Sequence, residues 1–485
     1  MTYIYDPKLA KLCKYNYPSQ ELKNEVSQVI TTEDYEKFFM WNKDDRRWLF
    51  DIYNNRLQEH FADRTHSQDK DTSKQFSRKK IEMAMDLLLK DYYRTLILDR
   101  DIRIDGRNMD QIRSLYCEVW TAGKYVHGSS LFWRWDTQVL NICTLGAPGD
   151  VELIDNMQQD IWEKRYMHHY NFPPFSVGEA RKIRWVGNRE IGHGKLAEKA
   201  LEFMIPSKLD FPYTIRLVSE CLSSGGSTSM GAVCASTMSL MDAWVPISKP
   251  VSGIAMWLCS RVDDNWLPVS YKILTDIQWA EDFNCDMDFK VAGTKDWITA
   301  IQLDMKVKWI SVQIALEVIK KANIGRLEIM DFMLQTIDKP RPDISPNAPR
   351  IVTIHVDPSK IKDVIGKWGE MIDKIIAETW VKIDFEDDGT CMITSRDELA
   401  VNKTIELINN IVLDPTVGNI YDWEIAKIES FGLFVKFANN KSWLVWSRNL
   451  PTKTENLQTM FTIKQKLKVK LVKVDSQWRY ELWLV

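Results

Sequence analysis

A proline-rich segment is the feature that most limits how this chain can fold. Residues 338–349 contain four prolines. Each proline fixes φ near −65° and removes a backbone N–H donor, so this segment can neither continue a helix nor join the middle of a sheet. We predict an extended linker over residues 338–350. The chain has 485 residues, which leaves room for roughly three or four domains divided by this linker.

An acidic stretch before the linker carries the strongest chemical signal. Asp286, Asp288 and Lys290 alternate with apolar residues, which predicts a strand with the three polar side chains on one face. Asp282 lies just upstream, where a turn could bring its carboxylate beside them. Carboxylates that converge must be neutralised, and oxygen ligands suit a hard cation such as Mg²⁺. A solvated acidic turn has the same composition, so this stretch alone leaves both interpretations open.

A glycine- and serine-rich loop gives a second signal. Residues 214–220 alternate like a strand, and the loop 223–231 then leads into small residues that are typical of a tightly packed helix. Such a loop at a helix N-terminus can present backbone N–H groups and hydroxyls to an anion. Many strand-to-helix turns are rich in glycine for steric reasons alone. Together with the acidic stretch, however, this loop suggests phosphoryl chemistry.

These motifs resemble the second catalytic core of the bacterial polynucleotide phosphorylases. The matching segments are residues 103–107, 169–174, 189–194, 224–230, 240–247 and 286–294. The resemblance implies processive 3′-to-5′ phosphorolysis of single-stranded RNA. This reaction degrades mRNA, releases nucleoside diphosphates and runs in reverse as polymerisation. We find no counterpart of the family's first catalytic core in this sequence. A catalytically silent RNA-binding or ring subunit of an RNA-degrading assembly is therefore the alternative.

The resemblance also assigns roles to individual residues. Three residues are implied in catalysis: Asp282, Asp288 and Lys290. The two carboxylates among them would hold Mg²⁺, which Mn²⁺ can replace. Four residues are implied in binding inorganic phosphate, the co-substrate: Ser227, Thr228, Ser229 and Arg134. A surface ion pair is the alternative role for Arg134.

Two RNA-binding domains are predicted after the linker. A GxxG loop lies between two helical stretches, as in KH domains, where the loop backbone clamps the sugar-phosphate chain. The C-terminal segment contains short strands and is similar to an OB-fold domain of the S-one type, in which aromatic side chains stack on bases. The residues implied in RNA binding are Gly366, Lys367, Gly369, Phe431 and Phe434.

The predicted fold is α+β and multidomain. We expect a helical linker domain (1–98), an RNase PH-like core (99–337), the linker (338–350), a KH domain (351–413) and an OB-fold barrel (414–485). The net charge of −3 gives no global attraction to RNA, so binding must depend on local patches. Scattered cysteines, no signal peptide and no membrane-spanning stretch predict a cytoplasmic protein. By the resemblance, we expect a ring-forming homo-oligomer, a trimer in the family, with RNA-degradation partners.

The tryptophan content is anomalous, because the chain has 20 tryptophans and 20 glycines. At twelve positions tryptophan stands where the family has glycine: Trp120, Trp135, Trp244, Trp257, Trp279, Trp297, Trp309, Trp368, Trp380, Trp423, Trp443 and Trp478. Glycine serves such positions by adopting positive φ or by letting backbones approach closely. Some bacteria read UGA as glycine. We therefore predict that many of these tryptophans arise from UGA codons that are glycine in the native protein.

Overall fold

The computed structural model describes two compact units. The described residues are 18–40, 43–62, 76–156, 159–183, 185–263, 268–278, 281, 286–412, 416–436, 442–450, 457–474 and 480–485. The first unit comprises Met1–Thr144, Tyr166–Pro206 and Arg216–Ser345, and the second comprises Leu145–Arg165, Ser207–Ile215 and Pro346–Val485. The change from one unit to the other after Ser345 falls inside the proline-rich segment.

The N-terminal part of the first unit is helical, as predicted. Its helices are α2 (Gln20–Val29), α3 (Thr32–Met40), α4 (Lys43–His60) and α6 (Arg78–Arg100). Their apolar faces share a core in which Leu22, Leu57 and Ile97 are fully buried. Helix α6 begins after Ser77, whose hydroxyl accepts the N–H of Lys80 and so satisfies one of the helix's unpaired donors.

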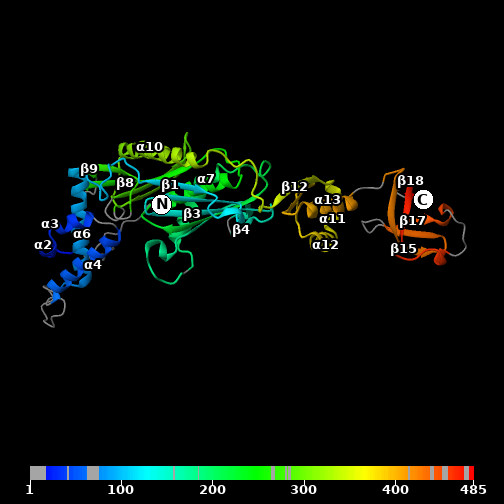
Figure 1. The fold of residues 1–485 in the computed structure, drawn as a ribbon, viewed down its shortest axis with the longest axis horizontal. Coiled ribbons are helices and arrows are strands. Elements are labelled where there is room, and N and C mark those ends of the chain that lie inside the picture. Colours follow the sequence, from blue (N-terminus) through cyan, green and yellow to red (C-terminus); the bar gives the residue numbers. More distant parts are fainter. Residues whose placement is uncertain are drawn as a thin grey trace. The chain divides into compact units, whose positions relative to one another are not determined.

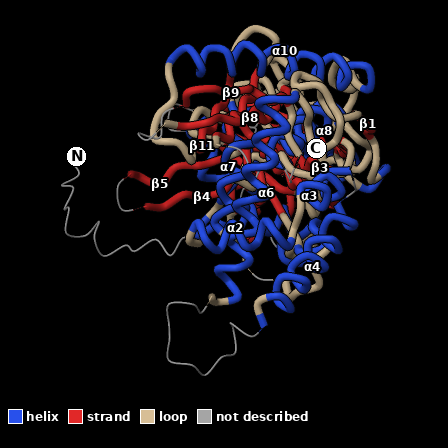
Figure 2. The backbone as a smooth tube through the Cα atoms, turned by 90° about the vertical axis from the view of Figure 1, so that its left-hand side faces the viewer, coloured by secondary structure: helices blue, strands red, loops and turns tan. Residues whose placement is uncertain are grey.

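Two sheets form the rest of the first unit. One has the order β1 (Leu115–Val119), β2 (Gly128–Arg134), β3 (Thr137–Gly146), β7 (Thr214–Ser223), β6 (Tyr166–Asn171). The other has the order β11 (Ile298–Met305), β10 (Met287–Gly293), β8 (Ser252–Val262), β9 (Pro268–Thr275), with all neighbours antiparallel. Three helices complete the unit: α7 (Asn188–Glu202), α8 (Thr228–Asp242) and α10 (Val312–Thr336). Figure 2 shows α6, α7 and α10 around the strands.

Helix α8 lies between the two sheets, because it packs against β2 of one and β8 of the other. Every one of its residues is buried. Small residues such as Gly231, Ala232 and Ala235 make this possible: the side chains of Val139 and Phe132 pack so closely on Gly231 that an added β-carbon would lie 3.2 Å from Val139. The sequence-based prediction of a tightly packed helix after the serine loop is therefore confirmed.

The second unit contains two further sheets (Figure 1). The KH-like part comprises β12 (Arg350–His355), α11 (Ile361–Ile365), α12 (Glu370–Thr379), β13 (Lys382–Phe385), β14 (Thr390–Ser395) and α13 (Glu398–Val412), with strand order β12-β14-β13.

The last sheet comprises β15 (Ile420–Glu429), β16 (Gly432–Lys436), β17 (Ser442–Trp446), β18 (Lys466–Val474) and β19 (Tyr480–Leu484). Its order is β17-β16-β15-β18-β19, and β17 also contacts β19, so the sheet nearly closes into a barrel. The predicted α+β multidomain class is confirmed.

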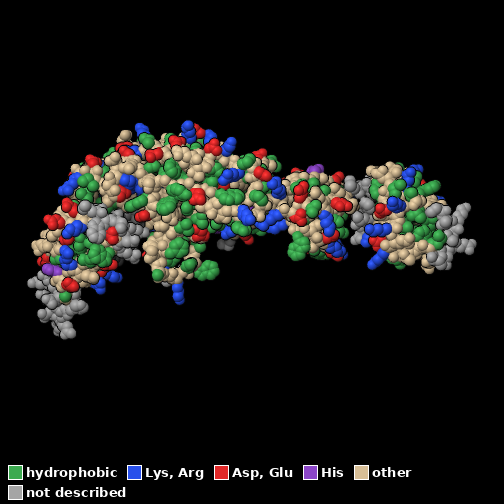
Figure 3. Space-filling model, viewed as in Figure 1, with side chains coloured by type: hydrophobic (Ala, Val, Ile, Leu, Met, Phe, Trp, Pro, Cys, Tyr) green, Lys and Arg blue, Asp and Glu red, His purple; other side chains and the backbone are tan. Residues whose placement is uncertain are grey.

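The remaining elements are short. A hairpin of β4 (Glu152–Asn156) and β5 (Gln159–Lys164) belongs to the second unit. The 3₁₀ turns among the described residues are η1 (Gly123–Tyr125), η2 (Pro174–Val177), η3 (Pro358–Lys360), η4 (Lys367–Gly369), η5 (Ser447–Asn449) and η6 (Leu457–Thr459). Within the described ranges, no helix has the length and apolar character needed to cross a membrane. On the face shown in Figure 3, basic and acidic side chains are interspersed, in keeping with the small net charge.

Tryptophan occupies backbone positions that favour glycine. Among the described residues, nine non-glycine residues have positive φ. Five of them are tryptophans: Trp120 (64°), Trp135 (49°), Trp244 (69°), Trp368 (59°) and Trp380 (57°). The left-handed region costs an L-residue roughly 1–2 kcal/mol. The side chains of Trp368 and Trp380 are 94% and 89% exposed, so burial does not offset this cost.

This backbone geometry supports the codon interpretation at those five positions. A β-carbon raises the energy of a left-handed backbone, whereas glycine adopts it readily. Trp279 and Trp478 lie outside the described residues. The remaining five tryptophans of the twelve do not have positive φ, so their backbones do not distinguish the two residue types.

We expect Trp380→Gly to stabilise the second unit by about 1 kcal/mol, because residue 380 is the left-handed C-cap of α12, where glycine is the preferred residue. Calorimetric unfolding of the full chain measures the change. Trp380→Ala is the matched control: it also removes the exposed indole but keeps the β-carbon and therefore the strain. Equal transition temperatures for the two variants would contradict the explanation.

We also expect glycine at position 368 in the chain that the native organism makes. Mass spectrometry of the native peptide that spans residues 364–370 measures this directly. A tryptophan mass at that position, or a UGG codon in the genome, would refute the codon interpretation there.

Candidate active site

The serine-rich loop joins β7 to α8, as predicted. Ser227 is the N-cap residue of α8, and Thr228 and Ser229 form the helix's first turn. The hydroxyl oxygens of Ser227 and Ser229 are buried and have no hydrogen-bond partner among the described residues. The hydroxyl of Thr228 accepts a hydrogen bond of 2.6 Å from Tyr170 and keeps its own proton to donate. Three hydroxyls beside the positive end of a helix suit an anion.

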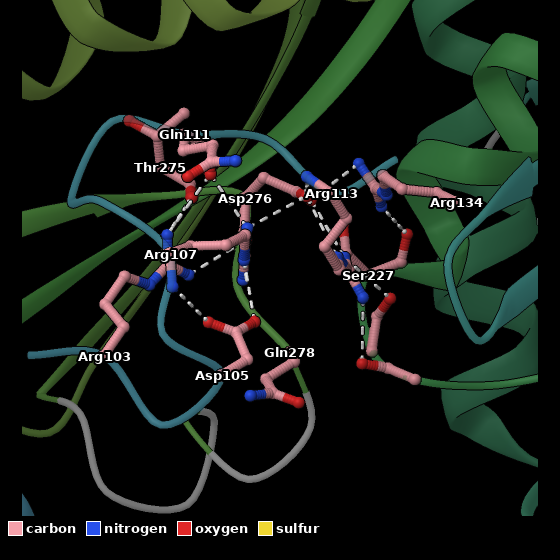
Figure 4. A network of polar contacts seen from close by, with 12 residues as sticks. Arg103, Asp105, Arg107, Gln111, Arg113, Arg134, Ser227, Thr275, Asp276 and Gln278 are labelled. Carbon is pink, nitrogen blue, oxygen red and sulfur yellow. Dashed lines mark hydrogen bonds and ion pairs between the residues drawn. The ribbon is translucent and has the colours of Figure 1, made fainter. Parts of the chain in front are cut away.

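Two buried arginines lie behind this loop and bind its carbonyl oxygens (Figure 4). Arg134 donates to the carbonyl of Ser227 at 2.9 Å. Arg113 donates to the carbonyls of Gly225 at 3.0 Å and Gly226 at 3.4 Å. Since the Arg134 side chain is fully buried, its contact with the predicted phosphate site passes through the loop backbone.

Asp276 connects the two arginines. Its Oδ1 lies 2.8 Å from Nη2 of Arg113 and 3.0 Å from Nη1 of Arg134. Burial alone would raise the pKa of Asp276, but Arg113 and Arg134 outweigh burial and hold the pKa well below its usual range. Burial lowers the pKa of Arg134 to about 10 although Asp276 opposes the change, so this guanidinium is charged at neutral pH.

Sequence reasoning missed Arg113 and Asp276. Neither belongs to a motif, and their hydrogen bonds join residues 163 positions apart. The only local signal is the position of Asp276 six residues before Asp282, at the entrance to the acidic stretch.

Asp288 and Lys290 lie on one face of β10, as the alternation predicts. Nζ of Lys290 is 2.9 Å from Oδ2 of Asp288. The other carboxylate oxygen, Oδ1, is buried and has no hydrogen-bond partner in the described parts of the chain. Burial raises the pKa of Asp288, and Lys290 opposes that rise. An oxygen in this setting can accept a proton or ligate a cation.

Asp286 does not join this pair. It precedes β10, and its Oδ2 accepts the backbone N–H and the hydroxyl of Ser260, both at 2.9 Å. Its Oδ1 pairs with the guanidinium of Arg94 on α6. The prediction that Asp286 converges with Asp288 and Lys290 is therefore wrong, because a basic side chain 192 positions away neutralises it.

A metal site here would need a ligand beyond Asp288. Asp282, the predicted second ligand, lies outside the described residues. Among the residues that are described, no three His, Cys, Asp or Glu side chains are grouped so that they could hold a metal ion. The unpartnered Oδ1 of Asp288 fits one ligand position of a hard cation such as Mg²⁺.

Trp257 stands beside Asp288. The two residues are directly opposite in the β8–β10 register, so their side chains share one face of the sheet. The indole is 3% exposed, and its N–H has no acceptor among the described residues. A buried donor without an acceptor costs about 1–3 kcal/mol. Glycine at this position would remove that donor and open space next to the carboxylate.

His193 on α7 connects the serine loop with β10. Its ring packs edge-on against Tyr170, at 5.2 Å between centroids, and Tyr170 in turn bonds Thr228. Burial lowers the pKa of His193 to about 3, with Lys290 as the next cause. The imidazole is therefore neutral at physiological pH. Tyr170 and His193 thus lie next to the serine-rich loop, and the influence of Lys290 on the pKa of His193 relates this region to β10.

The predicted KH loop is a turn between α11 and α12. Gly366 and Gly369 have φ of 76° and 83°, which a glycine adopts without strain. Lys367 and Trp368 lie between them, and the exposed indole projects from the turn that would receive RNA. The loop geometry therefore agrees with a nucleic-acid clamp, whereas Trp368 does not contribute to one.

The predicted stacking residues of the barrel lie together. Phe431 and Phe434 meet edge-on with ring centroids 6.2 Å apart. The ring of Trp446 lies 6.1 Å from that of Phe431, and Arg448 lies over Trp446 at 5.6 Å. Phe431 and Trp446 are more than two-fifths exposed. These rings form an aromatic surface of the kind that stacks on bases.

We expect His193 to make the first unit less stable in acid. Its folded pKa, about 3, is below the ordinary value of 6.5. As pH falls through 6.5, the unfolded chain binds a proton that the folded chain does not bind until about pH 3, so stability present above pH 6.5 is lost on acidification. Between pH 7 and 5 the loss should be about 1–2 kcal/mol. His193→Gln should abolish this part of the change in unfolding midpoint. The exposed His60, replaced by Gln, is the control and should leave the change intact.

Comparison with known proteins agrees with this geometry. Residues 111–246 match the model of the 3′ exoribonuclease family, domain 1 (RNase PH), and residues 351–410 match the KH domain. The polyribonucleotide nucleotidyltransferase of Natranaerobius thermophilus is 45% identical over 472 residues, 96% of this chain and 64% of the relative. That of Heliobacterium modesticaldum is 48% identical over 405 residues, 83% of this chain and 56% of the relative.

Among solved structures, rice (Oryza sativa) Rrp46 aligns with 48% of this chain and 99% of its own length, at 16% identity and a TM-score of 0.37. The chain therefore contains an RNase PH domain of the 3′ exoribonuclease family followed by a KH domain, and it is homologous to polyribonucleotide nucleotidyltransferases, spanning 56–64% of the length of the two compared.

Proposed function

We propose that this chain degrades single-stranded RNA from its 3′ end by phosphorolysis, processively and reversibly, and releases nucleoside diphosphates. The observation that carries the proposal is the pairing of an anion site with an acid–base pair. The hydroxyls of Ser227 and Ser229 and Oδ1 of Asp288 are buried without partners among the described residues. Tyr170 bonds Thr228 and packs against His193, and the charge of Lys290 helps to lower the pKa of His193. Buried polar atoms without partners are rare in native proteins and indicate a ligand.

Inorganic phosphate would lie on Ser227, Thr228 and Ser229, which donate hydroxyl protons to its oxygens. One phosphate oxygen attacks the phosphorus of the terminal phosphodiester in line. A new P–O bond forms, and the bond to the 3′ oxygen of the preceding nucleotide breaks. The products are a nucleoside diphosphate and an RNA one nucleotide shorter, so no covalent enzyme intermediate is required.

Two side chains of β10 would act on this transition state. Lys290 would stabilise the negative charge that develops on the transferred phosphoryl group. The departing 3′ oxygen needs a proton, and the raised pKa of Asp288 suits it to carry one. In the alternative assignment Asp288 remains ionised and holds Mg²⁺ together with Asp282, with Mn²⁺ as a substitute. The metal would supply electrostatic neutralisation of the phosphate oxygens.

The second unit would hold the RNA. Gly366, Lys367 and Gly369 would clamp the backbone, while Phe431 and Phe434 would stack on bases. Tethered binding sites raise the effective concentration of the 3′ end at the site. We further propose the domain limits predicted above, a cytoplasmic location, a ring-forming homo-oligomer such as a trimer, and RNA-degradation partners.

A second candidate is an RNA-binding subunit without catalysis. The position of Trp257 favours it if the tryptophan is genuine, because the buried indole shares a sheet face with Asp288. The two candidates differ in one product: only the first releases diphosphates from RNA in the presence of phosphate.

We expect shortening of a single-stranded RNA that requires both phosphate and Mg²⁺. Asp288→Asn should lower the rate by at least about a hundredfold, since acid–base and charge-stabilising groups contribute on this scale, and should leave RNA binding intact. Chromatography of the products and an RNA-binding titration measure the two effects. Asp296→Asn is the control, because Asp296 is exposed and pairs only with Lys249 among the described residues. Monophosphates formed equally well without phosphate would exclude phosphorolysis, and RNA binding without products would favour the second candidate.

A further inference from the structure

We infer that Asp276 is a positioning residue for phosphate: it orients Arg113 and Arg134, which turn the serine-rich loop so that its backbone N–H groups face the anion. The identity of the anion rests on the proposed function. The orientation of the loop rests on the geometry alone.

Three consecutive carbonyl groups of the loop point toward the arginines. Arg113 bonds those of Gly225 and Gly226, and Arg134 bonds that of Ser227. A trans peptide is planar, with its C=O and N–H on opposite sides. The N–H groups of the three following residues therefore point away from the arginines: that of Gly226 donates to the hydroxyl of Ser224 at 3.4 Å, which leaves those of Ser227 and Thr228 for the anion. Successive N–H groups on one side form an anion-binding concavity.

Asp276 orients both arginines toward these carbonyls, and the hydroxyl of Thr137 also donates to the carbonyl of Gly226, at 2.8 Å. Oδ2 of Asp276 accepts the backbone N–H of Arg113 at 2.8 Å and its Nε at 2.9 Å, while Oδ1 accepts Nη2 at 2.8 Å. This bidentate contact leaves Nη1 of Arg113 to bond Gly225. Arg134 likewise presents Nη1 to Asp276 and Nη2 to Ser227. Each guanidinium thus bridges the carboxylate and the loop (Figure 4).

Asp276 is itself held from both sides. It follows β9 in the left-handed region, with φ of 52°. Its backbone N–H donates to the carbonyl of Ala255 on β8 at 3.0 Å, and its carbonyl accepts from Arg107 at 2.8 Å and from Arg103 at 3.1 Å. The side chain is therefore fixed by a backbone that cannot readily rotate.

The charges favour the same function. Arg113 and Arg134 share Asp276 with Arg107, which also pairs with Asp105, so three arginines and two aspartates leave a net charge of +1 behind the loop. Asp276 prevents the guanidiniums of Arg113 and Arg134 from repelling each other, and the remaining charge attracts phosphate through the loop. Neither Arg113 nor Arg134 is a catalytic residue in this account, because each touches the loop and not the anion.

The test is Asp276→Asn in the full chain. Asparagine has the same shape and also tolerates the left-handed region, but it lacks the charge and one acceptor. We expect the KM for inorganic phosphate to rise at least about tenfold, because the N–H groups of the serine-rich loop would no longer be held toward the anion. The changes in kcat and in RNA affinity should be smaller. Hydrogen exchange at residues 226–229 should become faster, while exchange near Asp242, at the other end of α8, should not change.

The matched control is Asp242→Asn. Asp242 is equally buried, bonds Arg341 at 3.0 Å and Ser129, and lies fifteen residues along the chain from the loop. Its substitution should lower stability without changing the KM for phosphate or exchange in the loop. If both variants changed these quantities alike, or if folded Asp276→Asn changed neither, the inference would be overturned.

Two further results remain decisive. If Asp276→Asn does not fold, Arg113→Lys replaces it, because lysine keeps the charge but cannot bond the carboxylate and both carbonyls at once. Unchanged loop exchange and phosphate KM in this variant would overturn the inference. If the unaltered chain shows no phosphate-dependent turnover, the proposed function fails, but hydrogen exchange in the loop still decides whether Asp276 positions it.

Discussion

Buried ion pairs between two distant segments hold the first unit of this protein together. Arg103 and Glu281 are both fully buried and meet at 2.6 Å, and Arg113 meets Asp276 in the same way. Removing one partner of such a pair leaves an uncompensated charge and typically costs about 3–5 kcal/mol. These pairs connect residues 103–113 to residues 276–281, which precede β10 in the sequence. The serine-rich loop depends on these ion pairs, because Arg113 bonds two of its carbonyl groups.

Local pattern was sufficient to predict the elements that carry the proposed chemistry. The alternation around Asp288, the serine loop before a helix of small residues, and the GxxG turn each depend on neighbours within a few positions, and the structure contains all three. Interactions between distant residues could not be predicted this way. Nothing near Asp286 indicates that Arg94 neutralises it, and nothing near Arg113 indicates Asp276. The predicted acidic cluster was therefore too large by one carboxylate, and the arginines behind the loop were missed.

Several tryptophans occupy positions where the fold disfavours a large side chain. Five of them take a backbone conformation that a β-carbon disfavours, and the most exposed, Trp368, gains nothing from packing. Trp257, in contrast, is buried. Its indole lies on the same sheet face as the carboxylate of Asp288, and the indole N–H has no acceptor among the described residues. One explanation covers both the strained and the overfilled positions, namely that the fold was selected with glycine at each of them. This explanation also removes the main objection to catalysis by this chain.

The complete burial of α8 has a consequence for when the site comes into existence. Its residues are covered by β2, which precedes it, and by β8, which follows it in the chain. In a polypeptide still under synthesis, the face of α8 that packs against β8 has no cover until β8 has emerged. The phosphate cradle at the start of α8 can therefore be no more persistent than the assembled pair of sheets. Local opening of either sheet would expose α8, so protection of the α8 amides reports on the fraction of molecules in which the serine-rich loop keeps its position.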